Sequence, residues 1–320
     1  MIARRLILAA PLLPFAARAQ GSDAFPTRPM RAIVPFPPGS ATDGIARFVG
    51  ERIGRSLGQP VVIENVAGGN GAIAARQAAR AAPDGYTVMF ATNSTHAAAV
   101  HLLKEPGYDP VRDFTPVTLT SIAPLVLMVR ADFPARSVAE FITEAKARAG
   151  SMNYGTGNIG SLAAAQLLIS STGISAERIS YRGTPAAVTD LLAGRLHFMV
   201  SDLASAGEHV RAGTLRALGV TPARRIPMLP DVPTLQEAGV PGYDFASWVA
   251  VFAPARVPPA IVARLNHEIR GALDSEEGQR YSLSLGLVSA TGTPDDLARF
   301  QAREIDQWGS IAQAAGLPRE

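Results

Sequence analysis

The 320-residue sequence contains no cysteine, which excludes disulfide bridges, thiolate metal sites and cysteine nucleophiles. Histidine is scarce: the five residues are scattered, and the five-residue spacing of His96 and His101 does not put them on one helix face. No H-E-x-x-H or G-x-S-x-G sequence is present. We therefore expect no catalytic residues, no metal ligands and no cofactor, and we interpret each histidine as a surface or packing residue.

The chain also lacks runs rich in lysine or arginine. Of its 30 basic residues, Arg4, Arg5 and Arg18 lie within the first twenty positions, so the rest of the chain has 27 basic residues to balance its 27 acidic ones. A neutral chain without a basic patch has no electrostatic attraction to nucleic acid or to an acidic membrane surface. We expect neither as a partner.

Residues 1–19 have the pattern of a secretory signal peptide. Arg4 and Arg5 precede an apolar run over residues 6–16, and Ala17-Arg18-Ala19 fits a small-residue cleavage site. The run is too short to span a membrane. The sequence thus predicts an exported, periplasmic protein cleaved near Ala19. The general secretory route fits the surrounding residues better than the twin-arginine route, which the paired arginines leave open.

From residue 31 onward, short β-rich runs alternate with Ala/Leu-rich helical runs, which is typical of parallel sheets with crossover helices. The predicted strands are residues 31–35, 61–65, 86–92, 153–155, 178–181, 196–201 and 215–220. The predicted helices are residues 42–57, 71–82, 95–103, 137–148, 161–171, 185–193, 204–212, 259–273 and 294–314. The fold class is therefore α/β.

Two longer apolar segments, residues 116–130 and 243–254, look extended and bracket the second αβ series. If both cross between lobes, lobe 1 comprises residues 26–125 plus 244–320 and lobe 2 comprises residues 126–243, with a cleft between them. Two crossing strands would form a hinge. The alternative is one large doubly wound domain, which the chain length disfavours because single cores rarely exceed about 250–300 residues.

The segment 33–47 reads as an apolar strand, a Pro/Gly loop and an amphipathic helix. Ser40 and Asp43 have the spacing of a capping box, so we expect the helix to start at Ser40. The remaining free N–H groups and the helix dipole favour an anion, and Gly39 leaves the backbone open to a carboxylate or phosphate. The alternative is an ordinary strand-to-helix junction.

A second loop of this type runs from Gly155 to Ser161 and matches G-x-G-x-x-G. The dinucleotide interpretation is weak, because Glu177 precedes a strand where that motif needs an acid after one. We favour pairing this loop with the first, so that both close on one anion. Gly157 is expected to bring the backbone within hydrogen-bonding distance of the ligand carboxylate.

Three further loops follow predicted strands: residues 91–96, residues 181–185, and Ser201 with Asp202. Ligands of open α/β folds bind at strand ends, so we expect all five loops to face one crevice. For Asn93 and Ser94, capping of the next helix is an equally simple interpretation.

Several motifs resemble the tripartite tricarboxylate transporter substrate-binding proteins, the Bug family. They are the V-P-F-x-x-G-S-x-x-D-x-x-A-R segment within residues 33–47, Ala67-Gly68-Gly69-Asn70-Gly71, Pro83-Asp84-Gly85-Tyr86-Thr87, Tyr108-Asp109-Pro110 with Asp113-Phe114, Tyr181-Arg182-Gly183, and Leu229-Pro230-Asp231-Val232-Pro233-Thr234. The resemblance covers residues 26–315. It implies a type II periplasmic-binding-protein fold, two Rossmann-like αβ lobes joined by two crossing strands with a cleft between them.

The resemblance also implies a function: capture of a small carboxylate (an amino acid, a di- or tricarboxylate or an aromatic acid) for a membrane permease. It implies that backbone amides and ordered water in residues 36–42 and 155–161 hold one carboxylate. The residues expected to bind the ligand are Phe36, Pro38, Gly39, Ser40, Ala41, Thr42, Asn93, Ser94, Thr95, Gly157, Asn158, Gly160, Ser161, Thr184 and Asp202.

One departure from the family pattern is Pro37-Pro38 in the first loop, where the family commonly has small residues and a Gly-Gly pair. Two prolines remove two N–H donors and stiffen the loop, so we expect a narrower or shifted grip there. We expect a monomer. Two alternatives remain open: an exported enzyme, such as a hydrolase or oxidoreductase, and a sensor without a permease partner.

Overall fold

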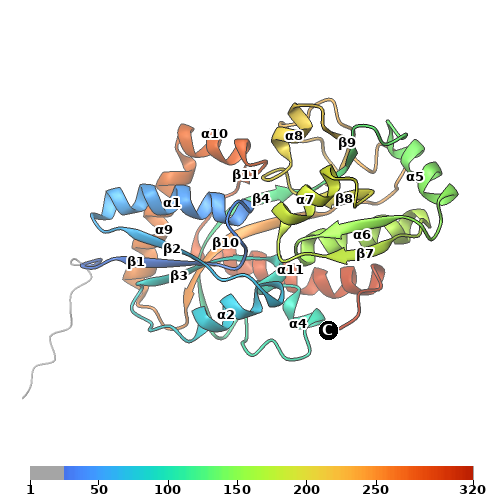
Figure 1. Cartoon of the computed structure of the whole chain (residues 1–320). Coiled ribbons are helices and arrows are strands. Elements are labelled where there is room, and N and C mark those ends of the chain that lie inside the picture. The colour runs from blue at the N-terminus through green and yellow to red at the C-terminus, as the bar shows by residue number, and fades with distance from the viewer. Residues whose placement is uncertain (1–24, 320) are drawn as a thin grey trace, which may run out of the picture.

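The computed structural model describes residues 25–319, whose strands form two separate sheets (Figure 1). The predicted signal peptide, residues 1–19, lies outside the described residues. The first sheet has six strands in the order β11-β4-β10-β3-β1-β2, with bounds β1 Met30–Val34, β2 Val61–Asn65, β3 Thr87–Thr92, β4 Phe114–Pro124, β10 Ala246–Pro254 and β11 Val288–Ser289. The second has five strands in the order β7-β6-β8-β5-β9, with bounds β5 Val126–Arg130, β6 Asn153–Thr156, β7 Glu177–Ser180, β8 Phe198–Ser201 and β9 Leu215–Val220.

Both sheets are mixed rather than purely parallel. β1 pairs parallel with β2 and β3, and β6 pairs parallel with β7 and β8. By contrast, β10 is antiparallel to β3 and β4, and β5 is antiparallel to β8 and β9. These two strands enter their sheet directly from the other sheet, so they run against the strands of the βα units. The prediction of parallel sheets is wrong for them.

The helices surround the two sheets. With the first sheet lie α1 Ala41–Leu57, the short 3-10 helix η2 Gly69–Gly71, α2 Ala72–Ala79, α3 Asn93–His96, α4 Ala99–Leu102, α9 Pro259–Asp274, α10 Glu276–Ser284 and α11 Pro294–Ala314. With the second lie α5 Val138–Ala147, α6 Ile159–Thr172, α7 Thr184–Leu192 and α8 Gly207–Arg211. Among residues 25–319, no helix is long and apolar enough to cross a membrane.

Most predicted elements are confirmed within a few residues, and two of the three differences have a physical cause in the structure. The single helix expected over residues 95–103 is split into α3 and α4, because Ala97 leaves the helical conformation (φ −138°, ψ −62°). The helix α10 was not predicted, since its polar sequence carries little apolar periodicity; Ser275 starts it by accepting a hydrogen bond from the N–H of Gly278. The two-residue strand β11 was missed as well.

The chain crosses between the sheets at Leu125. The run 116–130 is not one strand: β4 ends at Pro124 and β5 begins at Val126, in different sheets. The Leu125 N–H donates to Thr221 Oγ1 (3.0 Å), and the Thr221 N–H donates to the Leu125 carbonyl (2.9 Å). The Phe245 N–H donates to the Thr221 carbonyl (3.1 Å), just before β10 begins at Ala246. The outward and returning segments are therefore both hydrogen-bonded to Thr221, which follows β9.

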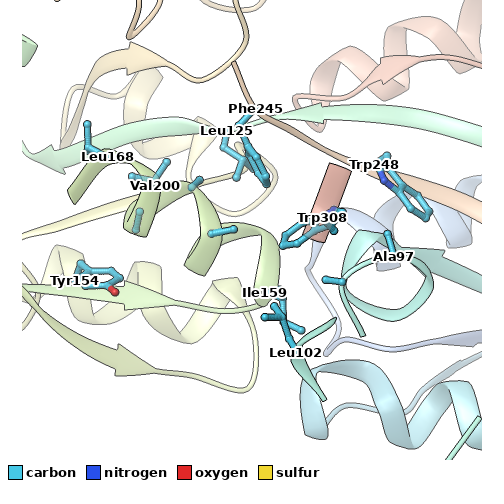
Figure 2. Packing of buried hydrophobic residues seen from close by; sticks show 14 of the residues in the cluster. Ala97, Leu102, Leu125, Tyr154, Ile159, Leu168, Val200, Phe245, Trp248 and Trp308 are labelled. Carbon is cyan, nitrogen blue, oxygen red and sulfur yellow. The ribbon is translucent and has the colours of Figure 1, made fainter. Parts of the chain in front are cut away.

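One hydrophobic cluster continues across both sheets (Figure 2). Tyr154 and Val200 belong to the second sheet and Trp248 to the first. Trp308 on α11 packs edge-on against Phe245, with 5.9 Å between ring centroids, and α11 also contacts α6. The molecule thus has two halves, one around each sheet. The C-terminal helix joins these halves in addition to the crossing segments.

Candidate ligand-binding site

A narrow cleft is lined by residues that follow strands of both sheets. The predicted site residues in its wall are Phe36, Ser40, Ala41, Thr42, Asn93, Ser94, Asn158, Thr184 and Asp202. The structure places Pro38, Gly39, Thr95, Gly157, Gly160 and Ser161 outside this lining. Each of the five predicted loops therefore contributes at least one residue to this cleft. Several other residues of these loops do not line the cleft and instead make hydrogen bonds or contacts within the loops.

The first loop ends at the start of α1, as its sequence predicts. Ser40 is the N-cap, and its Oγ accepts a hydrogen bond from the Asp43 N–H (3.3 Å). The Gly39 N–H, which we expected to face the ligand, instead donates to Asp43 Oδ2 (3.0 Å). What remains are the N–H groups of Ala41 and Thr42, which have no acceptor within the first helical turn and line the cleft.

Asp43 is the anchor of this loop. Arg47 Nε and Asn65 Nδ2 donate to its carboxylate at 3.0 and 2.9 Å. Burial would raise the pKa of Asp43, but the hydrogen bonds from Arg47, Asn65 and Gly39 hold that pKa below its usual value. Asp43 is therefore an ionised structural residue, and its charge is matched by Arg47.

Pro37 of the first loop packs against the other half of the molecule. A β-carbon at Gly183, which precedes α7, would come within 2.5 Å of Pro37 Cγ, so glycine at this position lets Pro37 pack against the opposite half. Ser205 Oγ also donates to the Gly39 carbonyl (3.1 Å). The first loop thus contacts the second half directly.

The second loop reaches the start of α6 with a similar arrangement. Asn158 is the N-cap, and its Oδ1 accepts from the Ser161 N–H (2.8 Å). Ser161 Oγ in turn accepts from the N–H groups of Gly157 (3.1 Å) and Asn158 (3.2 Å). The N–H groups of Ile159 and Gly160 remain without an acceptor in the first turn.

The two glycines of this loop have different surroundings. A β-carbon at Gly157 would lie 2.3 Å from the backbone nitrogen of Thr184, so this glycine is needed where two backbone segments meet, and its N–H is already bonded to Ser161. A β-carbon at Gly160 would lie 3.0 Å from Asn93 Nδ2 and 3.2 Å from Ser247 Oγ. Gly160, rather than Gly157, brings backbone close to the polar groups of the cleft.

Asn93 and Ser94 lie at the start of α3, immediately after β3. Asn93 Oδ1 accepts from Ser247 Oγ, while Asn93 Nδ2 and Ser94 Oγ are buried without a partner in the protein. Thr95 has a capping role, since its Oγ1 accepts from the Thr92 N–H (3.1 Å). A buried donor without a partner is costly, so these two groups are suited to a polar ligand.

His96 follows this cluster but does not belong to the site. Its ring packs against Phe114 and Phe252, with centroids 4.4 and 4.2 Å away. Complete burial lowers the pKa of His96 to about 3, so the ring is neutral. It is the packing residue that the sequence predicted.

Thr184 and Asp202 provide the polar wall of the second half. Asp202, directly after β8, is 6% exposed. Its Oδ1 accepts from the Ala204 N–H (3.1 Å) and its Oδ2 from Thr184 Oγ1 (3.3 Å). Burial raises the pKa of Asp202, although these hydrogen bonds act in the opposite direction.

The rest of the lining is the floor of the cleft. Thr92 belongs to the predicted loop 91–96, but Ala123, Leu125, Ser247, Trp248 and Val249 were not predicted to bind the ligand. Most of these lie on β4 and β10, the strands next to the crossing. The available signal was the segment 243–254, which was predicted only as a crossing strand.

The cleft has no lysine, arginine or histidine among the described residues that line it. Residues 25–319 also contain no group of three or more His, Asp or Glu side chains placed to hold a metal ion. The chemistry offered by the cleft is neutral hydrogen-bond donation from side chains and first-turn N–H groups, with one buried carboxyl.

Two sheets with crossing strands and a polar cleft between their loops define a type II periplasmic solute-binding protein. The sequence model of one protein family, described as the tripartite tricarboxylate transporter family receptor, matches residues 45–317 of this chain. The chain belongs to this family, which confirms the resemblance seen in its motifs.

Solved structures agree with this assignment. Rpa4515 of R. palustris, solved with adipate, has a TM-score of 0.90 and 36% identity over 92% of this chain and 99% of that one. The periplasmic binding protein BugD has a TM-score of 0.88 and 30% identity, covering 92% and 100%. MatC of Rhodopseudomonas palustris, solved with malate, has a TM-score of 0.83 and 34% identity, covering 90% and 99%.

Proposed function

We propose that this protein is a periplasmic receptor that captures a small carboxylate in the cleft and delivers it to a membrane permease of the tripartite tricarboxylate type. One observation carries the proposal: the first turn of α1 and the N-cap residue Asn158 of α6, from opposite halves, line one cleft that has no cation among its described lining residues. The N–H groups at helix starts are suited to bind an anion. The adipate and malate of the related structures belong to the same chemical class.

The ligand is bound without chemical change in this account, so the protein is not an enzyme. A thermal-shift screen of the mature protein against mono-, di- and tricarboxylates and amino acids, with sulfate as an anion control, tests the ligand class. A ligand at about 100 times its Kd stabilises the native state by roughly 2.7 kcal/mol and raises the Tm by several degrees. No shift across the panel, after bound ligand has been removed by refolding, would contradict the proposal. NMR of the recovered ligand should show it unaltered; turnover would favour the exported enzyme instead.

We further propose that residues 26–125 plus 244–320 and residues 126–243 move as two lobes about the crossing at Leu125 and Phe245. Since the ligand contacts come from both lobes, ligand binding should stabilise the closed form. Small-angle scattering should then show a smaller radius of gyration with ligand than without it. An unchanged radius despite saturating ligand would indicate a preformed site.

Export and assembly follow the same proposal. Mass analysis of protein secreted into the periplasm should give an N-terminus near Gln20, after cleavage at Ala19. We expect the mature protein to elute as a monomer in size-exclusion chromatography. Loss of ligand uptake in cells that lack the permease would distinguish a transport receptor from a sensor.

A further inference from the structure

A second cavity adjoins the floor of the cleft. It has a volume of about 170 Å³ and is lined mainly by residues of α11, of β10 and of the segment just before β10. Ser247 and Trp248 line both the cleft and this cavity. Part of the space around these two residues is therefore open, and close packing alone does not fix their position.

Glu304 on α11 supplies a specific bond to this part of the floor. The Trp248 indole N–H donates to Glu304 Oε2 (2.7 Å), and an indole has no other hydrogen-bonding group. Phe300, one turn earlier on α11, packs edge-on against the Trp248 ring with 5.5 Å between centroids. Trp248 is 1% exposed, so its N–H would be buried without a partner if this acceptor were removed, which is costly. The orientation of the indole therefore depends on α11.

The same part of the floor orients a donor of the cleft. Ser247, next to Trp248, donates through its Oγ to Asn93 Oδ1. Since Oδ1 is occupied in this way, the Asn93 amide presents Nδ2, which is buried without a partner in the protein. A displacement of β10 at Trp248 would move Ser247 and remove the bond that orients Asn93.

Glu304 also lies close to the crossing between the two sheets. Trp308, one turn further along α11, packs edge-on against Phe245 of the returning segment. Burial raises the pKa of Glu304, and hydrogen bonds from Trp248 and Trp308 act in the opposite direction. These are the two tryptophans of the sequence, and Figure 2 shows both. Tryptophan fluorescence therefore reports on the surroundings of Glu304.

We propose that Glu304 is a positioning residue for the ligand cleft and that it acts on the floor of the cleft through Trp248. Glu304 itself is not among the described residues that line the cleft. Without this acceptor the indole is free to turn into the open space of the second cavity, and Ser247 no longer fixes the amide of Asn93. The inference rests on the proposed function, because it concerns the affinity of the same cleft.

The test removes each end of the hydrogen bond and then both ends. The probe is the compound of the thermal-shift panel, adipate and malate included, that raises the Tm of the parent protein most. Glu304→Ala and Trp248→Phe should each weaken its binding by about tenfold in calorimetry. In the double variant, Glu304→Ala should cause no further loss, because Trp248→Phe has already removed the bond. A further tenfold loss would contradict action through Trp248 and overturn the inference.

The conservative variant separates the hydrogen bond from a general loss of packing. Glu304→Gln keeps an acceptor oxygen and should bind within about threefold of the parent. Asp306→Ala is the matched control, since it removes an exposed carboxylate from the same helix, and it should bind as the parent does. Glu304→Ala should change the tryptophan emission of the folded protein, whereas Glu304→Gln and Asp306→Ala should leave it unchanged.

Parental affinity in Glu304→Ala would overturn the inference and leave the proposed carboxylate receptor intact. If Glu304→Ala does not fold, the other two variants decide the question: parental affinity in Trp248→Phe, or a tenfold loss in Glu304→Gln, would overturn it. If no compound of the panel binds the parent protein, the proposed function itself fails, and the inference fails with it.

Discussion

The N-termini of α1 and α6 have the same capping arrangement, but their loops are held by different side chains. In both, the side chain of the N-cap residue accepts the third N–H of the helix, and the first two N–H groups remain for a ligand. At α1 a charged residue, Asp43, anchors the loop and needs Arg47 to balance it. At α6 the uncharged Ser161 anchors the loop, because its Oγ accepts hydrogen bonds from the N–H groups of Gly157 and Asn158.

This difference bears on where an anion binds best. The carboxylate of Asp43, paired with Arg47, already lies in the first turn of α1, while the first turn of α6 carries no acidic residue and its dipole is left for a ligand. The start of α6 should therefore contribute more to carboxylate binding than the start of α1. Neither Gly39 nor Gly160 is among the lining residues, but a β-carbon at Gly160 would approach Asn93 and Ser247 of the cleft, whereas one at Gly39 would approach only Pro185.

The largest effect on stability is expected for Gly157→Val. The new side chain would collide with the backbone of Gly183 and Thr184, so the free energy of unfolding should fall by about 3 kcal/mol. Urea unfolding measures it. A variant of parental stability that has lost its ligand would mean that Gly157 serves the ligand directly, as its sequence context suggested.

Gly160→Val tests the α6 side of the comparison. A β-carbon there approaches Asn93 and Ser247, and the added methyl groups would cover the free N–H groups, so affinity should fall about 100-fold or more. Gly271→Val in α9 is the control, since a β-carbon at Gly271 has no neighbour within 4 Å. Parental affinity in Gly160→Val, measured by calorimetry, would exclude this helix start from the site.

Asp43→Asn tests the charged anchor of the other helix start. Arg47 and the Gly39 N–H would lose their ionised acceptor, so the free energy of unfolding at pH 7 should fall by about 2 kcal/mol. Because the folded-state pKa is held below the ordinary value of 3.8, this stabilisation is complete above that pH and is lost as the pH falls further. Denaturant titrations at several pH values should show the parent and the variant converging in acid; a constant difference would argue against an ionised anchor.

Ser40→Ala should have the smallest effect. It removes a cap that contributes about 1 kcal/mol and leaves the N–H groups of Ala41 and Thr42 in place. Affinity should fall no more than about tenfold. A larger loss would show that the Ser40 hydroxyl itself contacts the ligand and that the two helix starts are less alike than their caps suggest.

The sequence predicted local features well because they depend on near neighbours. The cap at Ser40 rests on a three-residue spacing, and Thr184 and Asp202 follow from the rule that ligands bind at strand ends. Gly157 shows the limit of this reasoning: a glycine in a loop was expected to admit a ligand, but its neighbour is the backbone at Gly183 and Thr184, remote in sequence.

The floor of the cleft could not be predicted in the same way. Ser247 and Trp248 face the site only because β10 returns from the second sheet and runs antiparallel between β3 and β4. The sequence pattern around Ser247 and Trp248 is that of an apolar strand, and such a pattern is the same whether the strand lies at a cleft or in a core. The break at Leu125 depends likewise on its hydrogen bonds to Thr221, far along the chain.

The most direct test of the account is a crystal structure of the mature protein with the tightest-binding compound of the panel. We expect a ligand carboxylate in the cleft, within about 2.7–3.2 Å of first-turn N–H groups of α6 or of the Asn93 and Ser94 side chains, and without a lysine or arginine in contact. A ligand bound elsewhere, or a carboxylate held by an arginine, would contradict it.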